Sequence, residues 1–442
     1  MKPEIYDLPN DRARLDEVLK GRQGLLDPEE LARVSAIFAD VRQRGDTAIR
    51  EITQKFDKIE LSSLRISASA ADEAVAGLTP DLATAIEVCR ARMAAVNAAL
   101  MPSKKVEHRL DEHTLFGETC TALDSVAVWV PCRKGPLVST ALMLVVAAQV
   151  AGVPRIALCT PPLADGKPDP ATMAAARIAG ATEFYVGNGV ALLAGLTLGT
   201  ESLTAVAGMF GPGPSGITLA MGIAGMYGKK TCLGLGPSDC LVLCDETADP
   251  RFVALDLMTE AEHGPDSSAL LVTTSRALAE RVQAELSARI AEVAEPRRSV
   301  LQKIFGPGGR GALAVCPSLD ACIELTNAFA PEHMQIACSA ANTERVLASS
   351  PRSGEILIGQ QTPFSSANYA LGITAVLPTN GYARSLSGVT SRDMLRYSTL
   401  GSLDAAGLAK LVPSIGTLAR YEGLPCHAEA SEARPRYRDS KA

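Results

Sequence analysis

The stretch SVAVWVPCRKGPLVSTALMLVVAAQVAGVPRIALCTPP, residues 125–162, holds the pattern that decides the fold. It begins with a short apolar run at 126–130, continues with a longer one at 137–152 and ends with another short one at 156–160. Short apolar runs suit buried strands, and the longer one suits a helix. Two strands joined by a helical crossover lie parallel, so the stretch predicts a βαβ unit.

The same alternation continues on the C-terminal side of this stretch. It predicts an α/β protein with two doubly wound, Rossmann-like units, a helical N-terminal segment and a helical C-terminal tail. The tail after residue 383 shows no strand pattern, so we expect it to pack on another subunit. The runs that carry the alternation are TEFYVG (182–187), GVALLAGLTLG (189–199), AVAGMFG (205–211), DCLVLCD (239–245), a helix at about 250–263, ALLVTTS (269–275), a helix at 276–293, GALAVCPS (311–318) and LDACIELTNAF (319–329).

Composition narrows the class of protein. The 442 residues are 47% hydrophobic, which is enough for substantial cores, and the formal net charge of −6 gives no reason to expect nucleic-acid binding. The opening residues are charged, and the longest apolar stretch is too short to cross a bilayer. The eleven cysteines are scattered and form no CxxC pair, which favours reduced thiols. We expect a cytoplasmic protein without membrane or nucleic-acid partners.

The run NAFAPEHMQI, residues 327–336, places Glu332 beside His333 in otherwise small or apolar surroundings. Burying an unpaired charge is costly, so the pair is either solvated at a loop or held for a purpose. From a loop or a strand start the two side chains could converge on one site. A histidine with a pKa near neutral and a tuned carboxylate would then suit proton transfer.

Two other histidines also lie beside carboxylates at the ends of predicted elements. Glu260 and His263 fall three residues apart in the last turn of a helix that ends at Gly264, a spacing that metal sites use. Glu422 ends another helix, with His427 in the turn beyond it. A solvated surface pair remains the alternative in both places. Element ends are the positions from which α/β sheets present ligands.

The run FGPGPSG, residues 210–216, satisfies the pattern G-x-G-x-x-G between a predicted strand and a predicted helix. That pattern offers backbone N–H groups to a pyrophosphate at a helix N-terminus. Pro212 and Pro214 remove two of these groups, so a plain glycine-rich turn is the alternative.

Seven segments, taken in order, resemble the motifs of the histidinol dehydrogenase family. The resemblance covers residues from about 30 to 435, and AEHGPDS together with APEHMQI is highly specific. It implies a homodimer that oxidises an amino alcohol, or a related small polar alcohol, to the acid in two NAD-dependent steps at a zinc site. It also implies that the C-terminal tail reaches the partner's active site. The segments are VPCRKGPLVSTALML (130–144), FGPG (210–213), GPSDCLVLCD (236–245), AEHGPDS (261–267), APEHMQI (330–336), NYALGITAVLPTNGYAR (368–384) and LARYEGLPCHAEA (418–430).

The resemblance assigns roles residue by residue. His333 takes the alcohol proton, and Glu332 activates water to hydrate the aldehyde. Zinc is held by Glu260, His263, Asn368 and His427. Substrate contacts fall on the metal ligands, on His333, and on Ser238 and Glu422. The positions that contact NAD are Trp129, Val190 and Pro214.

Several of these positions depart from the family's usual residues. Glu260 stands where glutamine is usual and Asn368 where aspartate is usual, so the two changes together conserve the charge. Oxygen and imidazole ligands both suit zinc. Trp129, Val190 and Pro214 replace tyrosine, glutamine and asparagine, and the last two lose side-chain hydrogen bonds to NAD. Thr374 and Ala375 replace an Asn-His pair, which bears on the shape of the substrate.

Two other functions stay open at this point. One is a zinc enzyme on the same scaffold that does hydrolytic or lyase chemistry through Glu332. The other is a binding or regulatory paralogue without turnover. For the domains, we expect a helical arm at 1–25, a first α/β domain from 26–130 and 240–382, a second α/β domain on the nucleotide side at 131–239, and a C-terminal tail at 383–442 that is exchanged in a dimer.

Overall fold

The computed structural model describes residues 2–20, 27–132, 135–232, 234 and 236–439. Residues 21–25 of the expected N-terminal arm and 133–134 of the opening stretch lie outside the described residues. The chain divides into two compact units. The first contains the chain up to Leu100 and Leu123–Met394, and the second contains Met101–Ala122 and the chain from Leu395 onward.

One sheet of the first unit carries most of the polar residues singled out from the sequence. Its six strands pair in the order β1-β12-β11-β10-β13-β14, and every pairing is parallel. Buried parallel strands read as continuous apolar runs, as DCLVLC and SALLVT do here. The strands are β1 (Ile5–Asp7), β10 (Asp239–Cys244), β11 (Ser268–Thr273), β12 (Gly311–Val315), β13 (His333–Ala337) and β14 (Glu355–Ile358).

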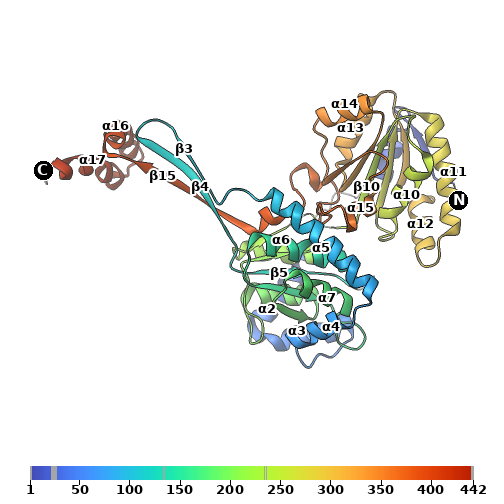
Figure 1. The fold of residues 1–442 in the computed structure, drawn as a ribbon, viewed down its shortest axis with the longest axis horizontal. Coiled ribbons are helices and arrows are strands. Elements are labelled where there is room, and N and C mark those ends of the chain that lie inside the picture. Colours follow the sequence, from blue (N-terminus) through green and yellow to red (C-terminus); the bar gives the residue numbers. More distant parts are fainter. Residues whose placement is uncertain (1, 21–26, 133–134, 233, 235, 440–442) are drawn as a thin grey trace. The chain divides into compact units, whose positions relative to one another are not determined.

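Helices cover both faces of this sheet, as Figure 1 shows around β10. Alternate residues of β10 point to opposite faces, so Val242 packs with one set of helices and Leu241 with the other. The first set is α10 (Pro250–Ala261), α11 (Arg276–Glu292), α12 (Arg297–Phe305) and α15 (Phe364–Tyr369), and the second is α1 (Arg12–Val18), α13 (Leu319–Phe329) and α14 (Ala340–Ala348).

The other sheet of the first unit contains the stretch that opened the sequence analysis. Its strands pair in the order β2-β7-β6-β5-β8-β9, all parallel except the short edge pairing of β2 with β7. The predicted α/β architecture with parallel strands is confirmed. The strands are β2 (Arg65–Ile66), β5 (Val126–Trp129), β6 (Ile156–Thr160), β7 (Glu183–Val186), β8 (Gly208–Phe210) and β9 (Lys230–Thr231).

Eight helices accompany this sheet in the described part of the chain. Four of them share one hydrophobic core with the sheet: α2 (Pro28–Arg44), α3 (Asp46–Asp57), α8 (Gly189–Leu198) and α9 (Ser215–Met226). The others pack against one another: α4 (Ala68–Ala76), α5 (Pro80–Leu100), α6 (Val138–Ala151) and α7 (Pro170–Ala179). Two short 3₁₀ helices, η1 (Tyr382–Arg384) and η2 (Ser391–Met394), follow much later in the chain.

Short polar residues set where many of the helices begin. An N-cap side chain accepts a hydrogen bond from an N–H group that the first helical turn leaves unpaired. Proline at the first helical position strengthens the start of α2, α7 and α10, because proline has no N–H to leave unsatisfied. The capping residues are Asp27, Ser67, Asp169, Asn188, Asp249, Ser275, Ser318 and Asp404.

The second unit contains a strand that the sequence reading missed. β15 (Leu395–Leu403) pairs antiparallel with β4 (Thr114–Ala122), which pairs with β3 (Lys105–Arg109), and Figure 1 shows the three as a long ribbon. The expectation of a tail without strands after residue 383 is therefore wrong. The run RYSTLGSL contains few apolar residues, and every residue from Arg396 to Leu403 is at least partly exposed. No buried apolar run therefore marks this strand in the sequence. The helices that follow are α16 (Ala405–Tyr421) and α17 (Pro425–Asp439).

The strand pairing also corrects the expected domain boundaries. β2 and β5, from 26–130, pair in the same sheet as β6 and β7 and not in the sheet formed by 240–382, although both sheets belong to the first unit. The arm expected at 1–25 supplies a strand, β1, to the sheet of β10. The tail begins its own unit at Leu395 and takes residues 101–122 with it. These pairings join segments far apart in the chain, so no local pattern marks them.

Two observations bear on the expected environment of the protein. Among the described residues, no helix combines the length and the apolar composition that a membrane crossing needs. The eleven cysteines are all free thiols; seven of them are buried, three are partly exposed and Cys426 is exposed.

Asp245 ties the end of β10 to the start of α14. Its carboxylate accepts hydrogen bonds from the Thr247 hydroxyl at 2.5 Å, the Ser339 N–H at 2.9 Å and the Asn342 amide at 2.8 Å. Burial by itself would raise the pKa of Asp245, but these hydrogen bonds outweigh it and lower the pKa to about 2. A carboxylate whose pKa is lower in the folded state than in the unfolded state stabilises the protein at pH values above its unfolded-state pKa. This stabilisation is lost as the pH falls through the folded-state pKa.

We expect Asp245→Asn to lower the unfolding temperature at pH 7, because an amide places an N–H against donors that need an acceptor. The cost is on the order of 1–3 kcal/mol. The gap between variant and wild type should narrow from about pH 4 down to about pH 2, as the wild-type carboxylate is protonated. Thermal unfolding across this range measures the gap.

Asp249→Asn is the control, because asparagine caps a helix as well as aspartate does and Asp249 caps α10. A gap for Asp245→Asn that stayed constant with pH would contradict the assignment of the effect to the carboxylate charge.

Candidate active site

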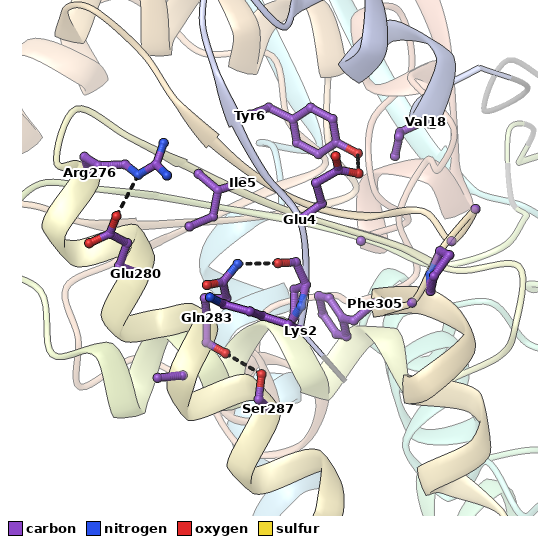
Figure 2. Close-up of a pocket in the computed structure, with 17 residues that line it drawn as sticks. Lys2, Glu4, Ile5, Tyr6, Val18, Arg276, Glu280, Gln283, Ser287 and Phe305 are labelled. Atoms are coloured by element: carbon purple, nitrogen blue, oxygen red, sulfur yellow. Dashed lines mark hydrogen bonds and ion pairs between the residues drawn. The ribbon is translucent and has the colours of Figure 1, made fainter.

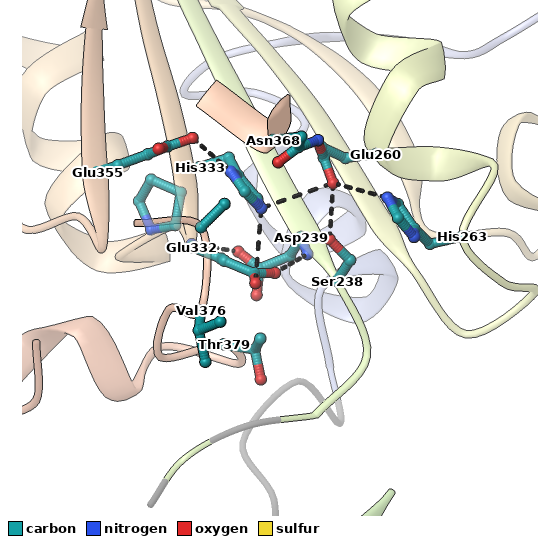
Figure 3. Close-up of polar contacts among 12 residues, drawn as sticks. Ser238, Asp239, Glu260, His263, Glu332, His333, Glu355, Asn368, Val376 and Thr379 are labelled. Atoms are coloured by element: carbon teal, nitrogen blue, oxygen red, sulfur yellow. Dashed lines mark hydrogen bonds and ion pairs between the residues drawn. The ribbon is translucent and has the colours of Figure 1, made fainter. Parts of the chain in front are cut away.

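His333 is the centre of the candidate site and is only 2% exposed. It is the first residue of β13, directly after the turn that follows α13. Its ring Nδ1 lies 2.5 Å from Oε1 of Glu355, and its Nε2 lies 3.5 Å from a carboxylate oxygen of each of Glu260 and Glu332 (Figure 3). Of the two placements considered for Glu332 and His333, a loop or a strand start, the structure shows the strand start. The two side chains converge there, and the pair is buried and not solvated.

Glu332 is held by a reciprocal pair of hydrogen bonds with Asp239. The Asp239 N–H donates to Oε2 of Glu332 at 3.0 Å, and the Glu332 N–H donates to Oδ1 of Asp239 at 2.8 Å. The second oxygen of Asp239 accepts the N–H of Asn380 at 2.7 Å. These bonds fix the orientation of the Glu332 carboxylate, so its other oxygen, Oε1, faces His333.

Glu260 gathers the next set of predicted residues. It lies in the last turn of α10, is 1% exposed, and accepts hydrogen bonds from Ser238 Oγ at 3.0 Å and Asn368 Nδ2 at 2.8 Å. His263 Nε2 lies 3.3 Å from Oε2 of Glu260, with the His263 side chain half exposed. The spacing of Glu260 and His263 therefore marks a buried carboxylate with an accessible imidazole, not a solvated pair.

The cluster lies at the amino edge of the sheet. Asp239, His333 and Glu355 are the first residues of β10, β13 and β14. We expected these pairs at the ends of elements, without naming an edge, whereas ligands of parallel sheets usually bind at the carboxyl edge. The reason for the amino edge lies in α10, whose C-terminal turn returns to it and carries Glu260 there.

Burial and charge act against each other in this cluster. Burial would lower the pKa of His333, but the carboxylates of Glu260, Glu332 and Glu355 raise that pKa well above its usual value. Burial raises the pKa of Glu332 and Glu355, and the charge of His333 only partly offsets it. Burial would also raise the pKa of Glu260, but His333 and His263, with hydrogen bonds from Asn368 and Ser238, hold it below its usual value. Glu332 and Glu260 thus have pKa values shifted in opposite directions.

The donor set around Glu260 suits a zinc ion. Glu260, His263 and Asn368 converge and offer a carboxylate oxygen, an imidazole nitrogen and an amide oxygen. The amide oxygen and nitrogen of Asn368 exchange places by a rotation of the side chain. Among the described residues, no group of three or more His, Cys, Asp and Glu side chains is arranged to hold a metal ion. The three residues fit the metal as a partial set that needs a further ligand.

Glu422 and His427 are not members of this cluster. Both belong to the second unit and are exposed, Glu422 just after α16 and His427 in the first turn of α17. His427 was expected in a turn beyond the helix, but a second helix begins at Pro425.

The predicted NAD contacts lie at the carboxyl ends of β5, β7 and β8. Trp129 ends β5, Val190 lies in the first turn of α8, and Pro214 precedes α9. The strand, turn and helix expected around FGPGPSG are all present. A Cβ on Gly211 would lie 2.1 Å from the Trp129 carbonyl oxygen, so the close approach of these two strand ends requires glycine.

The side chain of Trp129 offers a nucleotide little surface. Only 4% of it is exposed, and a Cβ added to Gly189 would lie 2.7 Å from its ring. Its Nε1–H is buried and has no hydrogen-bond partner in the described part of the chain. The helix N-termini at this edge suit a pyrophosphate, but the side chains of Val190 and Pro214 provide no hydrogen bonds.

Two residues of the site were not found from the sequence. Asp239 and Glu355 each open an apolar strand, in DCLVLC and EILI, and a carboxylate at that place in a buried strand is the signal that could have found them. The pairing of β13 with β14, which sets Glu355 opposite His333, is not visible in the sequence.

A pocket of about 1200 Å³ lies elsewhere, along β1 and α11. Figure 2 shows it between Lys2, Gln283 and Phe305, and Arg276 and Glu280 in its lining form an ion pair with each other. None of the predicted site residues lines it, so its size does not make it the active site.

Comparisons with known proteins agree with the resemblance of the motifs. A family model described as histidinol dehydrogenase matches residues 22–435. The chain is 36% identical over 430 residues to a histidinol dehydrogenase of Methanosarcina mazei, covering 97% of both chains. It is 37% identical over 415 residues to one of Synechocystis sp., covering 92% of this chain and 93% of the relative.

A solved structure gives the same result for the fold. The crystal structure of histidinol dehydrogenase from Elizabethkingia anophelis superposes with a TM-score of 0.91 at 29% identity, over 99% of each chain. The sequence match over nearly the whole chain, together with this fold, shows that the protein belongs to the histidinol dehydrogenase family of NAD-dependent oxidoreductases.

Proposed function

We propose that the protein oxidises L-histidinol to L-histidine through the aldehyde, with zinc and two molecules of NAD, as a cytoplasmic homodimer in histidine biosynthesis. The observation that carries the proposal is the buried pair of Glu332 and His333. The Nε2 of His333 faces the Glu332 carboxylate on one side and Glu260, an expected zinc ligand, on the other. The expected substrate position at this metal therefore lies beside a proton acceptor.

In the first step, Nε2 of neutral His333 would take the proton of the substrate hydroxyl, and bound NAD would accept the hydride from the carbinol carbon. Zinc held by Glu260 would offset the charge of that carboxylate and so favour the neutral imidazole over the imidazolium. The product is the aldehyde, with one NADH and one proton released. Glu332 next takes a proton from a water molecule, whose oxygen adds to the aldehyde carbon, and Glu332 then returns this proton to the former carbonyl oxygen to give the hydrate. Its raised pKa suits this role, because a base near the working pH transfers protons most effectively.

In the last step, His333 takes a proton from the hydrate and a second hydride leaves for NAD, which gives the carboxylic acid. The two oxidations thus remove four electrons and consume one water. The reciprocal hydrogen bonds with Asp239 keep Glu332 in place through the sequence. Asp239 therefore supports the base without contacting the substrate.

Glu260, His263 and Asn368 would hold the zinc ion, with His427 as the fourth ligand. Bound there, zinc would polarise the oxygen of the substrate as a Lewis acid. Ser238 donates to Glu260 and so supports the same ligand. With its hydrogen bond to Glu260, Asn368 keeps one carboxylate and one amide in the set, which supports the view that the two departures from the usual family residues compensate each other.

The homodimer and the exchange of the tail are supported by the second unit. His427 and Glu422 are expected at the zinc site and in contact with the substrate, yet they lie on helices outside the first unit. The second unit exposes large apolar side chains: Leu411, Leu418, Tyr421 and Leu424. An exposed apolar group of this kind favours burial against another chain.

An enzyme on the same scaffold without redox chemistry is the second candidate. Val190 and Pro214 give NAD no side-chain hydrogen bonds, and Trp129 is buried, which favours weak or altered nucleotide binding. Glu332 could then activate water for hydrolytic or lyase chemistry at the same metal.

The first test is NADH formation from L-histidinol and NAD by the zinc-loaded protein. We expect turnover in the wild type and a loss of about 10²–10⁴-fold in His333→Gln and Glu332→Gln, the range for removing a general base. Glu324→Gln, an exposed carboxylate on α13, is the control and should keep full activity. Water activation serves only the second oxidation, so Glu332→Gln should retain oxidation of the alcohol to the aldehyde better than His333→Gln. A folded wild type that holds zinc but forms no NADH would favour the second candidate.

Zinc content after exhaustive dialysis tests the metal set. The wild type should keep about one zinc ion per chain, as expected for a site of three or four protein ligands. Glu260→Ala and His263→Ala should lose it, whereas His108→Gln, an exposed histidine in β3, should keep it. A wild type without zinc, purified in the absence of chelators, would remove the metal from the proposal.

Hybrid dimers test the exchange of the tail. His333→Gln and His427→Gln should each be inactive alone. If one subunit completes the other's site, each mixed dimer carries one intact site. An equimolar random mixture, in which about half of the dimers are mixed, then recovers about a quarter of the wild-type activity. No recovery in mixtures shown by mass to contain mixed dimers would place His427 and His333 of one site on the same chain.

A further inference from the structure

Glu355 is a buried carboxylate that the proposed steps do not use. It is the first residue of β14 and is 8% exposed. In the parallel pairing of β13 with β14, it stands directly opposite His333. The side chain therefore reaches the imidazole from the neighbouring strand, on the side away from Glu260 and Glu332 (Figure 3).

The contacts of Glu355 are one-sided. Its Oε1 lies 2.5 Å from Nδ1 of His333, while its Oε2 is buried and has no hydrogen-bond partner among the described residues. An unpaired buried oxygen costs on the order of 1–3 kcal/mol. The chain keeps a carboxylate here at a cost, and the one side chain that gains from it is His333.

The ring of His333 is constrained from another direction as well. Phe364 packs edge-on against it, with the ring centroids 5.7 Å apart and an angle of 64° between the planes. The aromatic contact limits the tilt of the imidazole, and the hydrogen bond to Glu355 decides which ring nitrogen faces each side. With Nδ1 bound to Glu355, Nε2 points to Glu260 and Glu332.

We propose that Glu355 is a positioning residue that holds the Nδ1–H of His333, so that the proton exchanged with substrate is always the one on Nε2. The role rests on the proposed function of His333 as the base. An ionised carboxylate can only accept a hydrogen bond, so the ring nitrogen that faces it has to carry the proton. Glu355 therefore fixes the tautomer of the neutral ring as well as its orientation. Carboxylate and histidine pairs act in this way in serine proteases and at metal sites.

The activity test compares Glu355→Leu with Glu355→Gln. Both should lower kcat by about 10²–10⁴-fold, because leucine removes the acceptor and glutamine can turn an N–H toward Nδ1 and favour the other tautomer. KM and zinc content should change by less than about two-fold, since the metal ligands stay in place. Leucine also leaves the Nδ1–H of His333 without an acceptor, so we expect it to lower the unfolding temperature. Glu324→Gln again serves as the control.

A space-filling role makes a different prediction. Glutamine has nearly the shape of glutamate, so Glu355→Gln would then keep the wild-type kcat, and that result would overturn the proposal. Glutamine also keeps the test usable if the leucine variant fails to fold.

A proton NMR measurement tests the inference without any turnover. A ring N–H shared with a buried carboxylate gives a resolved, strongly downfield signal. We expect one in both metal-free and zinc-loaded protein, lost in Glu355→Leu and in His333→Gln. A wild type without the signal, or a signal that survives in Glu355→Leu, would overturn the proposal. A wild type with the signal but without histidinol oxidation would contradict the proposed function alone.

Discussion

The candidate site depends on burying one imidazole among three carboxylates at the amino edge of a parallel sheet. Each charge there would be unstable alone, since burial raises the pKa of Glu332 and Glu355 and opposes the charge on His333. Together they stabilise one another, and the neighbouring strand starts supply the backbone N–H groups that hold Glu332 and Asp239. Removing any one member leaves the others with a buried charge and no compensation.

This arrangement explains why Glu260 and Asn368 have to be considered as a pair. The two residues are 108 positions apart in sequence, yet their side chains are joined by a hydrogen bond. A carboxylate at position 260 and an amide at position 368 give the same charge as the opposite arrangement. The position of the charge differs, however, because Glu260 lies within 3.5 Å of both His333 and His263. The carboxylate therefore belongs to the proton-transfer pair as well as to the expected metal set.

At the predicted NAD site, the backbone favours nucleotide binding more than the side chains do. The close approach at Gly211 and the helix starts at Gly189 and Ser215 follow the geometry that favours a pyrophosphate. The side chains expected to contact NAD are buried or apolar. Binding at such a site would rely on backbone groups and helix N-termini, which tolerate a change of side chain better than specific side-chain hydrogen bonds do.

The sequence alone determined the α/β class, the run of strands and helices, and the residues that gather in the site: Ser238, Glu260, His263, Glu332, His333 and Asn368. The class and the elements follow from local apolar periodicity and helix caps. The pairs Glu260/His263 and Glu332/His333 follow from their spacing, and Ser238 and Asn368 only from the resemblance to the family's motifs. Tertiary structure decided the rest. Strand pairing placed β2 and β5 in the sheet of β6 and β7, made a strand of 395–403, put the cluster at the amino edge and set Glu355 opposite His333. The physical reason is that hydrogen bonds within a helix join near neighbours, whereas those within a sheet join strands whose partner and register leave no trace in either segment by itself.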